Sequence, residues 1–271
     1  MEKKEIKKFR CKVWQYYRAH GRDLPWRCTT DPYRIVVSEI MLQQTQVDRV
    51  RGKYEAFLRT FPNFRALAGA SSATVLRVWQ GLGYNRRALA LHELAKIVVK
   101  ECRGILPRAP KVLETLPGIG PATAGSIAAF AFDAPAVFVE TNIRRAIIHY
   151  FFPRRKNICE EDIAAAATNV LDRKKPREWY WALMDYGSML GKKIVNPNRR
   201  SAKYRRQPAF KGSNRELRGR IVRLLVEKSR VAVSSLLAFT RESGERVDTV
   251  LRALEREGFL RRKGEVVMIV K

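Results

Sequence analysis

The chain has 271 residues, 46% of them hydrophobic, and its 54 lysine and arginine residues against 26 aspartate and glutamate residues give a formal net charge of +28. This length and apolar content are enough for one large or two modest domains with a packed core. The positive charge exceeds what solubility requires and indicates a polyanionic partner. No apolar run reaches the roughly 18 residues of a membrane span, and the opening MEKKEIKKFR lacks the apolar core of a signal peptide. We therefore expect a cytoplasmic protein, associated with the nucleoid if its source is prokaryotic.

Apolar residues at helical spacing dominate the chain up to about residue 190. The pattern predicts helices over 5–20, 33–50, 52–60, 72–79, 86–102, 111–116, 121–132, 141–151, 160–172 and 177–190. No convincing strand pattern appears before about residue 258. The sequence therefore predicts an all-α body.

A Gly-rich turn separates two of these helices. Proline disfavours the helical conformation in the residue before it, so Pro117 and Gly118 must end the helix that precedes them. Gly118 and Gly120 leave backbone N–H groups unobstructed, and the next helix begins at Pro121 with the positive end of its dipole facing outward. This arrangement predicts an anion site, although a lone Gly-x-Gly also fits an ordinary turn between helices.

Glu39 is a carboxylate within the apolar part of the predicted helix over 33–50. Such a residue is either solvated between two buried faces or a desolvated acid with a raised pKa. The sequence pattern by itself favours the solvated residue. The cysteines, Cys11, Cys28, Cys102 and Cys159, are too scattered for a disulfide framework or for close metal-ligand spacing.

The composition changes after Gly191. The stretch 192–211 contains eight basic residues and no acidic one, so it is either a solvated tether or a segment that contacts phosphates. Beyond it the sequence predicts helices over 214–228, 233–241 and 244–257 and a basic hairpin that turns near Lys263 and Gly264. This end resembles a small winged helix-turn-helix, a module that binds DNA in some proteins and supports protein contacts in others. We therefore expect three parts: 1–191, a basic linker 192–213, and a winged-helix-like module 214–271.

Several segments together resemble the helix-hairpin-helix DNA glycosylases, and most closely the MutY-type adenine glycosylases. They are LPW at 24–26, DPYRIVVSEIMLQQTQV at 31–47, VWQGLGYNRRA at 78–88, LPGIGPATAGSI at 116–127, VETNIRR at 139–145 and ALMDYGSML at 182–190. The resemblance covers roughly residues 5–190. It implies an all-α helix-hairpin-helix glycosylase fold for this part of the chain.

The resemblance implies roles for three catalytic residues. Glu39 matches the glutamate that protonates the departing purine at N7 and then helps water attack the sugar. Glu140 lies where the family has an aspartate that stabilises the positively charged sugar, with Asn142 beside it. This glutamate is a departure from the family pattern. Bifunctional relatives have a lysine at the position of Ala122, so the resemblance implies base removal by hydrolysis alone.

The same resemblance implies contacts to a flipped base and to the duplex. The surroundings of the flipped adenine match Trp26, Arg27, Leu42 and Asp185. Gln44 matches the residue that inserts into the base stack. Near the opposite base and the phosphates we expect Gln43, Thr45, Leu82, Tyr84, Gly118 and Gly120. The implied partner is double-stranded DNA with a mismatched or damaged base, bound by a monomer.

A second departure concerns the iron–sulfur cluster of typical family members, whose four cysteines follow the ALMDYG-like helix. This chain has no cysteine after Cys159, so we expect no cluster and no other cofactor or metal. We expect the stretch 192–211 to take the place of the cluster. It would fold back through Pro197, Tyr204 and Phe210, and its expected phosphate contacts are Arg199, Arg200, Arg205 and Arg206.

These observations predict a monofunctional DNA glycosylase of base excision repair that acts on mismatched adenine. A thymine or uracil mismatch glycosylase is the alternative on the same scaffold. A catalytically silent helix-hairpin-helix DNA-binding protein is the alternative outside enzymes.

Overall fold

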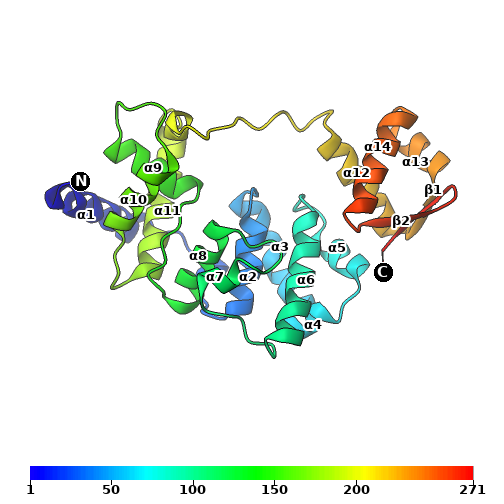
Figure 1. Cartoon of the computed structure of the whole chain (residues 1–271), viewed down its shortest axis with the longest axis horizontal. Helices are drawn as coiled ribbons and strands as arrows, with labels where there is room; N and C mark the ends of the chain where they lie inside the picture. The colour runs from blue at the N-terminus through cyan, green and yellow to red at the C-terminus, as the bar shows by residue number, and fades with distance from the viewer. Residues whose placement is uncertain (271) are drawn as a thin grey trace. The chain divides into compact units, whose positions relative to one another are not determined.

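The computed structural model describes residues 1–270, which are mostly helical (Figure 1). They form two compact units: Met1–Glu39 with Pro107–Arg206, and Ile40–Leu106 with Gln207–Lys271. The chain therefore leaves the first unit after Glu39 and returns to it at Pro107. The three parts expected from the sequence, 1–191, 192–213 and 214–271, have boundaries that differ from those of the two compact units. This division into three parts stays a prediction. None of the helices within residues 1–270 is long and apolar enough to cross a membrane.

The first unit consists of helices, and α2 (Pro32–Leu42) begins in it. Its other elements are α1 (Lys3–His20), the 3-10 helix η1 (Pro25–Arg27), α7 (Pro110–Leu113), α8 (Pro121–Phe132), α9 (Thr141–Phe151), α10 (Glu160–Val170), α11 (Pro176–Lys193) and the 3-10 helix η2 (Pro197–Arg200). Helices α8 and α9 have the predicted bounds, and α1, α10 and α11 differ from the prediction by a few residues at their ends. The apolar pattern was sufficient for α1, α9, α10 and α11 because each has one buried face.

Aromatic side chains and glycines hold α1, α9 and α11 together. The ring of Phe9 is fully buried and lies with its centroid 4.8 to 6.4 Å from aromatic rings on α9 and α11. Helix α11 packs along α9 (Figure 1). At their crossing, a Cβ on Gly187 would lie 2.0 Å from the carbonyl oxygen of Asn142. Only glycine fits there, so Gly187 sets how closely α11 approaches the start of α9.

Helix α8 is almost entirely buried. Gly125 faces the side chain of Phe138, where a Cβ would come within 2.6 Å of the Phe138 Cβ. Ser126 is 4% exposed. The small side chains of α8 therefore let the segment that precedes α9 lie directly against it.

The second unit contains helices and one small sheet. Its elements are α3 (Val47–Thr60), α4 (Phe64–Ala68), α5 (Ser72–Trp79), α6 (Arg86–Glu101), α12 (Asn214–Lys228), β1 (Arg230–Ala232), α13 (Val233–Thr240), α14 (Gly244–Arg256), β2 (Leu260–Lys263) and β3 (Val266–Ile269). Trp79 is fully buried and packs edge-on against Phe57. Helix α12 contacts α5, so the C-terminal residues belong to the same compact unit.

The three strands form an antiparallel sheet in the order β1-β3-β2. Val267 on the central strand pairs with Val231 on one side and Arg262 on the other. The hairpin of β2 and β3 turns at Gly264, whose φ is +56°, as the Lys263-Gly264 signal predicted. The three helices and the hairpin predicted for residues 214–270 are thus present. Their assignment as a winged helix stays a prediction.

The structure corrects several local predictions. The helix predicted over 33–50 is interrupted, because α2 ends at Leu42 and α3 begins at Val47. Gln44, in the interruption, has a φ of +53°, which no helix interior allows. The helix predicted over 111–116 ends at Leu113. Helix α4 and strand β1 were missed, since five and three residues are too few to show a period.

Candidate active site

Glu39 lies on α2 and is the predicted acid. Its Oε2 accepts a hydrogen bond of 2.6 Å from the hydroxyl of Ser126 on α8, and the residue keeps partial exposure. Burial of the carboxyl raises its pKa to about 7, although the hydrogen bond from Ser126 acts in the opposite direction. The charge of Glu140 adds to the rise, and that of Arg27 opposes it. Of the two readings of Glu39, the geometry favours the desolvated acid.

Glu140 occupies the position just before α9 and caps that helix. Its Oε1 accepts from the backbone N–H groups of Asn142 and Ile143, each at 2.8 Å, and its Oε2 accepts from the Asn142 side chain at 3.1 Å. Burial raises the pKa of the Glu140 carboxyl, while these donors and Arg145 favour its charged form. Both oxygens are therefore held in fixed positions by the first turn of α9.

Asn142 connects Glu140 to a cation that the sequence had not singled out. Its Oδ1 accepts from Arg145 at 2.8 Å, and the same guanidinium nitrogen donates to the carbonyl of Gly187 at 2.8 Å. Arg145 thus joins the start of α9 to α11. A charge-assisted bond of this kind fixes the amide of Asn142 beside the carboxylate of Glu140.

Asp185, on α11, forms the densest ionic cluster of the first unit. Its carboxylate is 2% exposed and pairs with Arg22 at 2.6 Å and Arg27 at 2.7 Å. Arg22 also donates its backbone N–H at 2.9 Å. Burial by itself would raise the pKa of Asp185, but the hydrogen bonds and charges of Arg27 and Arg22 hold that pKa below its ordinary value. The cluster fixes Arg27, next to the buried side chain of Trp26.

A buried arginine organises the residues predicted to enter the duplex. Arg87, on α6, donates to the carbonyls of Ile40, Met41 and Gln43 at the end of α2. It also donates to Gly83 O at 3.1 Å and to the Thr45 hydroxyl at 2.9 Å. These bonds satisfy carbonyls that a helix end leaves without partners. The turn 43–46 and the loop 81–84 are therefore held by one guanidinium.

Gln44 and Tyr84 are exposed residues of these two loops. Both have left-handed backbones, with φ of +53° and +47°. The hydroxyl of Tyr84 accepts from Gln207 and from Arg215, the latter at 3.2 Å. Leu82 differs from the expectation, because its side chain is 1% exposed and belongs to the core. It is not available for a direct contact to DNA.

The Gly-rich turn has the predicted geometry. Gly118 has a φ of +80°, and Gly120 is the N-cap of α8 with Pro121 in the first turn. A Cβ on Gly120 would have no atom within 4 Å, so the approach to the start of α8 is open on that side. The positive end of the α8 dipole therefore lies at an accessible turn.

The basic segment contains two kinds of arginine. Arg200 donates to the carbonyls of Ile148, Phe152 and Pro153, so its guanidinium anchors η2 to the end of α9. Arg199, Arg205 and Arg206 are exposed. The expected fold-back is confirmed at Pro197, which is buried. It is wrong at Phe210, whose side chain is 59% exposed.

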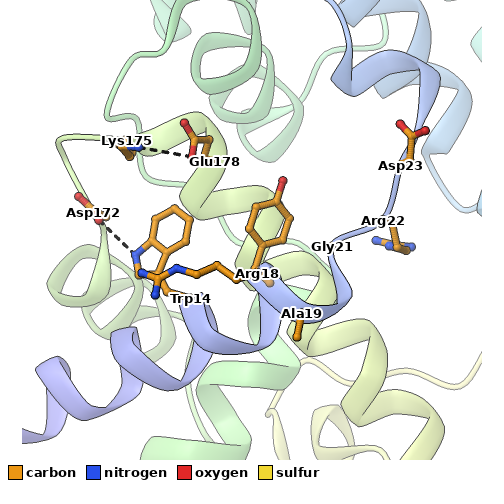
Figure 2. A pocket seen from close by; sticks show the side chains of 10 residues that line it. Trp14, Arg18, Ala19, Gly21, Arg22, Asp23, Asp172, Lys175 and Glu178 are labelled. Atoms are coloured by element: carbon orange, nitrogen blue, oxygen red, sulfur yellow. Dashed lines mark hydrogen bonds and ion pairs between the residues drawn. The ribbon is translucent and has the colours of Figure 1, made fainter.

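A cleft of about 700 Å³ lies between α1 and the start of α11 (Figure 2). Its lining includes Arg22 but not Glu39 or Asp185. Two pairs of its lining residues interact with each other. Trp14 donates a hydrogen bond to Asp172 at 3.3 Å, and Lys175 forms an ion pair with Glu178 at 3.7 Å. The predicted catalytic groups therefore lie outside this cleft.

Comparison with known proteins agrees with this arrangement. Residues 37–171 match the model of the HhH-GPD superfamily of base excision DNA repair proteins. An adenine DNA glycosylase of Mycobacterium tuberculosis is 35% identical over 232 residues, which are 78% of this chain and 75% of that protein. One from Mycolicibacterium smegmatis is 45% identical over 133 residues, 49% of this chain and 45% of that protein. This chain belongs to the HhH-GPD superfamily.

Solved structures support the same fold. A thermostable thymine-DNA glycosylase superposes with a TM-score of 0.64 at 29% identity, over 69% of this chain and 87% of that one. A non-covalent endonuclease III–DNA complex gives a TM-score of 0.59 at 14% identity, over 68% of this chain and 85% of that one. The helix-hairpin-helix glycosylase fold predicted from the motifs is therefore confirmed.

Four residues of these networks were missed by sequence reasoning. They are Arg22, Arg87, Ser126 and Arg145. The arginines were hidden among many others in a strongly basic chain, and a serine within an alanine-rich helix is not unusual. Each contacts residues at least 42 positions away or links two elements, and a one-dimensional pattern has no signal for such contacts.

Asp185→Asn tests the ionic cluster. We expect the free energy of unfolding to fall by about 3 kcal/mol at pH 7, because Arg22 and Arg27 would lose their buried counter-charge. Since the pKa of Asp185 is lowered, this contribution is present above about pH 4 and is lost as the pH falls further. Urea unfolding of both proteins at pH 7 and pH 3 measures the difference. Glu55→Gln on the exposed face of α3 is the control, and equal losses in the two variants would contradict the role of the cluster.

Proposed function

We propose that this protein is a monofunctional DNA glycosylase that removes mismatched adenine from double-stranded DNA, acting as a monomer. Its relatives from two mycobacteria are named adenine DNA glycosylases. The chain spans less than half of one of these proteins and three quarters of the other. The observation that carries the proposal is Glu39, a carboxyl with a pKa near neutrality at the position of the family's catalytic acid.

The proposed first step is protonation of the departing adenine at N7. A carboxyl with a pKa of about 7 is partly protonated at neutral pH and can therefore act as a general acid. The base then leaves in neutral form, and the ionised Glu39 is suited to take a proton from the attacking water. Ala122 has no amine to attack the sugar, so water is the nucleophile of the proposed reaction.

Glu140 and Asn142 are the proposed stabilisers of the positive charge that develops on the sugar. Their support is geometric, because the hydrogen bonds at the start of α9 fix both oxygens of Glu140 before any substrate binds. Preorganised charge is effective because it needs no rearrangement during the reaction. The glutamate departs from the family's aspartate, and the cap allows its longer side chain a single well-defined position.

Trp26, Arg27, Leu42 and Asp185 are the proposed surroundings of the flipped base. The guanidinium of Arg27 is held by Asp185 through bonds of 2.7 and 2.8 Å, so it can act as a fixed donor to one edge of a base. Gln44, in its exposed turn, is the proposed wedge, with Gln43, Thr45 and Tyr84 near the opposite strand. A wedge offsets part of the few kcal/mol that base extrusion costs.

Thymine is the second candidate base. The specific observation in its favour is the solved thymine-DNA glycosylase, which is 29% identical to this chain. A panel of duplexes that contain each mismatch, treated with alkali after incubation, distinguishes the two bases. Release of thymine or uracil in preference to adenine would replace the proposed substrate and keep the proposed reaction.

Glu39→Gln should abolish base release and leave duplex affinity nearly unchanged, because the amide is nearly isosteric but cannot donate the proton. Single-turnover assays on the best duplex of the panel and binding of the same duplex measure the two effects. For the wild type we also expect base release to fall as the pH rises above about 7, where the acid ionises. A variant that keeps more than about a tenth of the wild-type rate would remove Glu39 from the mechanism.

We propose that the protein works without an iron–sulfur cluster. The four thiols do not fit such a group: Cys11 and Cys28 are exposed, Cys102 and Cys159 lie on other elements, and no cysteine follows Cys159. In the segment after α11, hydrogen bonds of Arg200 and of Asn198 take on the anchoring. Elemental analysis of purified protein should find no stoichiometric iron, and absorbance near 400 nm from a bound cluster would overturn this proposal.

Exposed arginines of the basic segment are proposed phosphate contacts. We expect Arg199→Ser, Arg205→Ser and Arg206→Ser together to weaken binding to any duplex and to flatten the log–log salt slope by about two to three units, since each lost contact removes roughly 0.9. Mismatch preference should survive, because phosphate contacts carry no base information. Lys4→Ser, Lys7→Ser and Lys8→Ser on exposed positions of α1 remove the same charge as a control. Equal salt slopes in the two triple variants would show that the segment is only a tether and does not contact phosphates.

A further inference from the structure

The hydroxyl of Ser126 is the one group that hydrogen-bonds the Glu39 carboxyl within residues 1–270. The distance from Ser126 Oγ to Glu39 Oε2 is 2.6 Å, which is typical of a charge-assisted O–H···O bond. Ser126 is 4% exposed and lies on α8. Burial therefore keeps the Ser126 hydroxyl beside Glu39.

Ser126 has a second acceptor nearby. Its Oγ lies 3.0 Å from the carbonyl oxygen of Thr123, one turn earlier on α8. A hydroxyl has one proton to donate and lone pairs to accept. It can donate to Glu39 when that carboxyl is ionised, and it can turn to Thr123 when the carboxyl is neutral. Ser126 thus has a partner in both protonation states of Glu39.

The two oxygens of Glu39 are not equivalent. Oε2 accepts the hydrogen bond from Ser126. Oε1 has no hydrogen-bond partner within residues 1–270 and is not fully buried. Oε1 therefore retains access to solvent. An acid that serves a substrate needs its proton on the accessible oxygen, and a donor on the other oxygen favours that arrangement.

We propose that Ser126 is a positioning residue for Glu39, which holds Oε2 and directs the exchangeable proton to Oε1. This inference rests on the proposed function for its meaning in catalysis. Ser126 neither touches the substrate nor transfers a proton itself. It sets which oxygen is the acid and limits how strongly burial favours the neutral form.

The other groups that influence Glu39 are charged and lie on different elements. Glu140, at the start of α9, raises the pKa of Glu39, and Arg27, in η1, lowers it. Ser126 is neutral, so replacing it changes no charge in the site. An effect of its removal on the titration of Glu39 can therefore be attributed to the hydrogen bond.

Titration of Glu39 in Ser126→Ala tests the proposal. Full-length protein labelled with ¹³C at the glutamate carboxyl is followed by NMR between pH 5 and 9, and Glu39→Gln identifies the resonance. Loss of a donor to the ionised form should raise the pKa of Glu39 by about one unit. Alanine is smaller than serine and favours helix, and circular dichroism checks that α8 is retained.

Ser38→Ala is the matched control. Ser38 is a buried serine on α2 that bonds to the carbonyl of Ile35 at 2.9 Å, and its loss should leave the titration of Glu39 as in the wild type. The same titration midpoint in wild type and Ser126→Ala would overturn the proposal, as would equal shifts in both serine variants. This readout needs no base release, so it stands even if the proposed function fails.

Base release gives the second readout. The acid must be protonated to act, so the rate falls as the pH rises through the pKa of Glu39. In Ser126→Ala we expect this alkaline limb to move upward by about one pH unit, with a three- to tenfold lower maximal rate from the lost alignment. A lower rate of base release with an unchanged pH dependence would mean that Ser126 contributes only to packing. If the wild type releases no base, the proposed function is refuted. The NMR titration then still decides whether Ser126 positions Glu39.

Discussion

Burial of a single carboxyl group, that of Glu39, is the constraint on which the proposed chemistry depends. Removal from water favours the neutral acid and moves its pKa to about 7. Full isolation would make the group inert, since a carboxyl that never ionises cannot give up its proton. The hydrogen bond from Ser126 and the remaining exposure keep both forms accessible.

Positive charge has two separate uses in this molecule. Arg27, Arg87, Arg145 and Arg200 donate to carboxylates, amides or backbone carbonyls, and they act as structural cations. The planar guanidinium suits this purpose because it presents several donors in a fixed geometry. Exposed cations differ: among residues 1–270, Arg205 bonds only the carbonyl of its neighbour Tyr204, so it ties no distant elements together. The net charge of +28 therefore overstates the number of groups that can contact DNA, although it correctly indicates the kind of partner.

The glutamate at position 140 illustrates how a departure from a family pattern can be accommodated. Its extra methylene would normally add a rotatable bond and so reduce positional accuracy. Here the carboxylate caps α9 and accepts from two backbone N–H groups and one side-chain amide. The hydrogen bonds of the helix cap thus hold the carboxylate of Glu140 in place, although its side chain is longer than that of aspartate. The same cap brings Asn142 and, through Arg145, the close approach of α11 at Gly187 into one network.

The sequence by itself determined the helices with a long buried face, the turn at Gly264 and the family, because periodicity, turn residues and ordered motifs are local signals. It also located Glu39, but residue types alone left two readings of it. Only the tertiary structure showed that Ser126 bonds Glu39, that Arg87 binds the carbonyls at the end of α2, and that Leu82 is buried. It also showed that Arg200 anchors η2 to the end of α9. These outcomes depend on contacts between distant segments, where burial and hydrogen-bond geometry override local propensity.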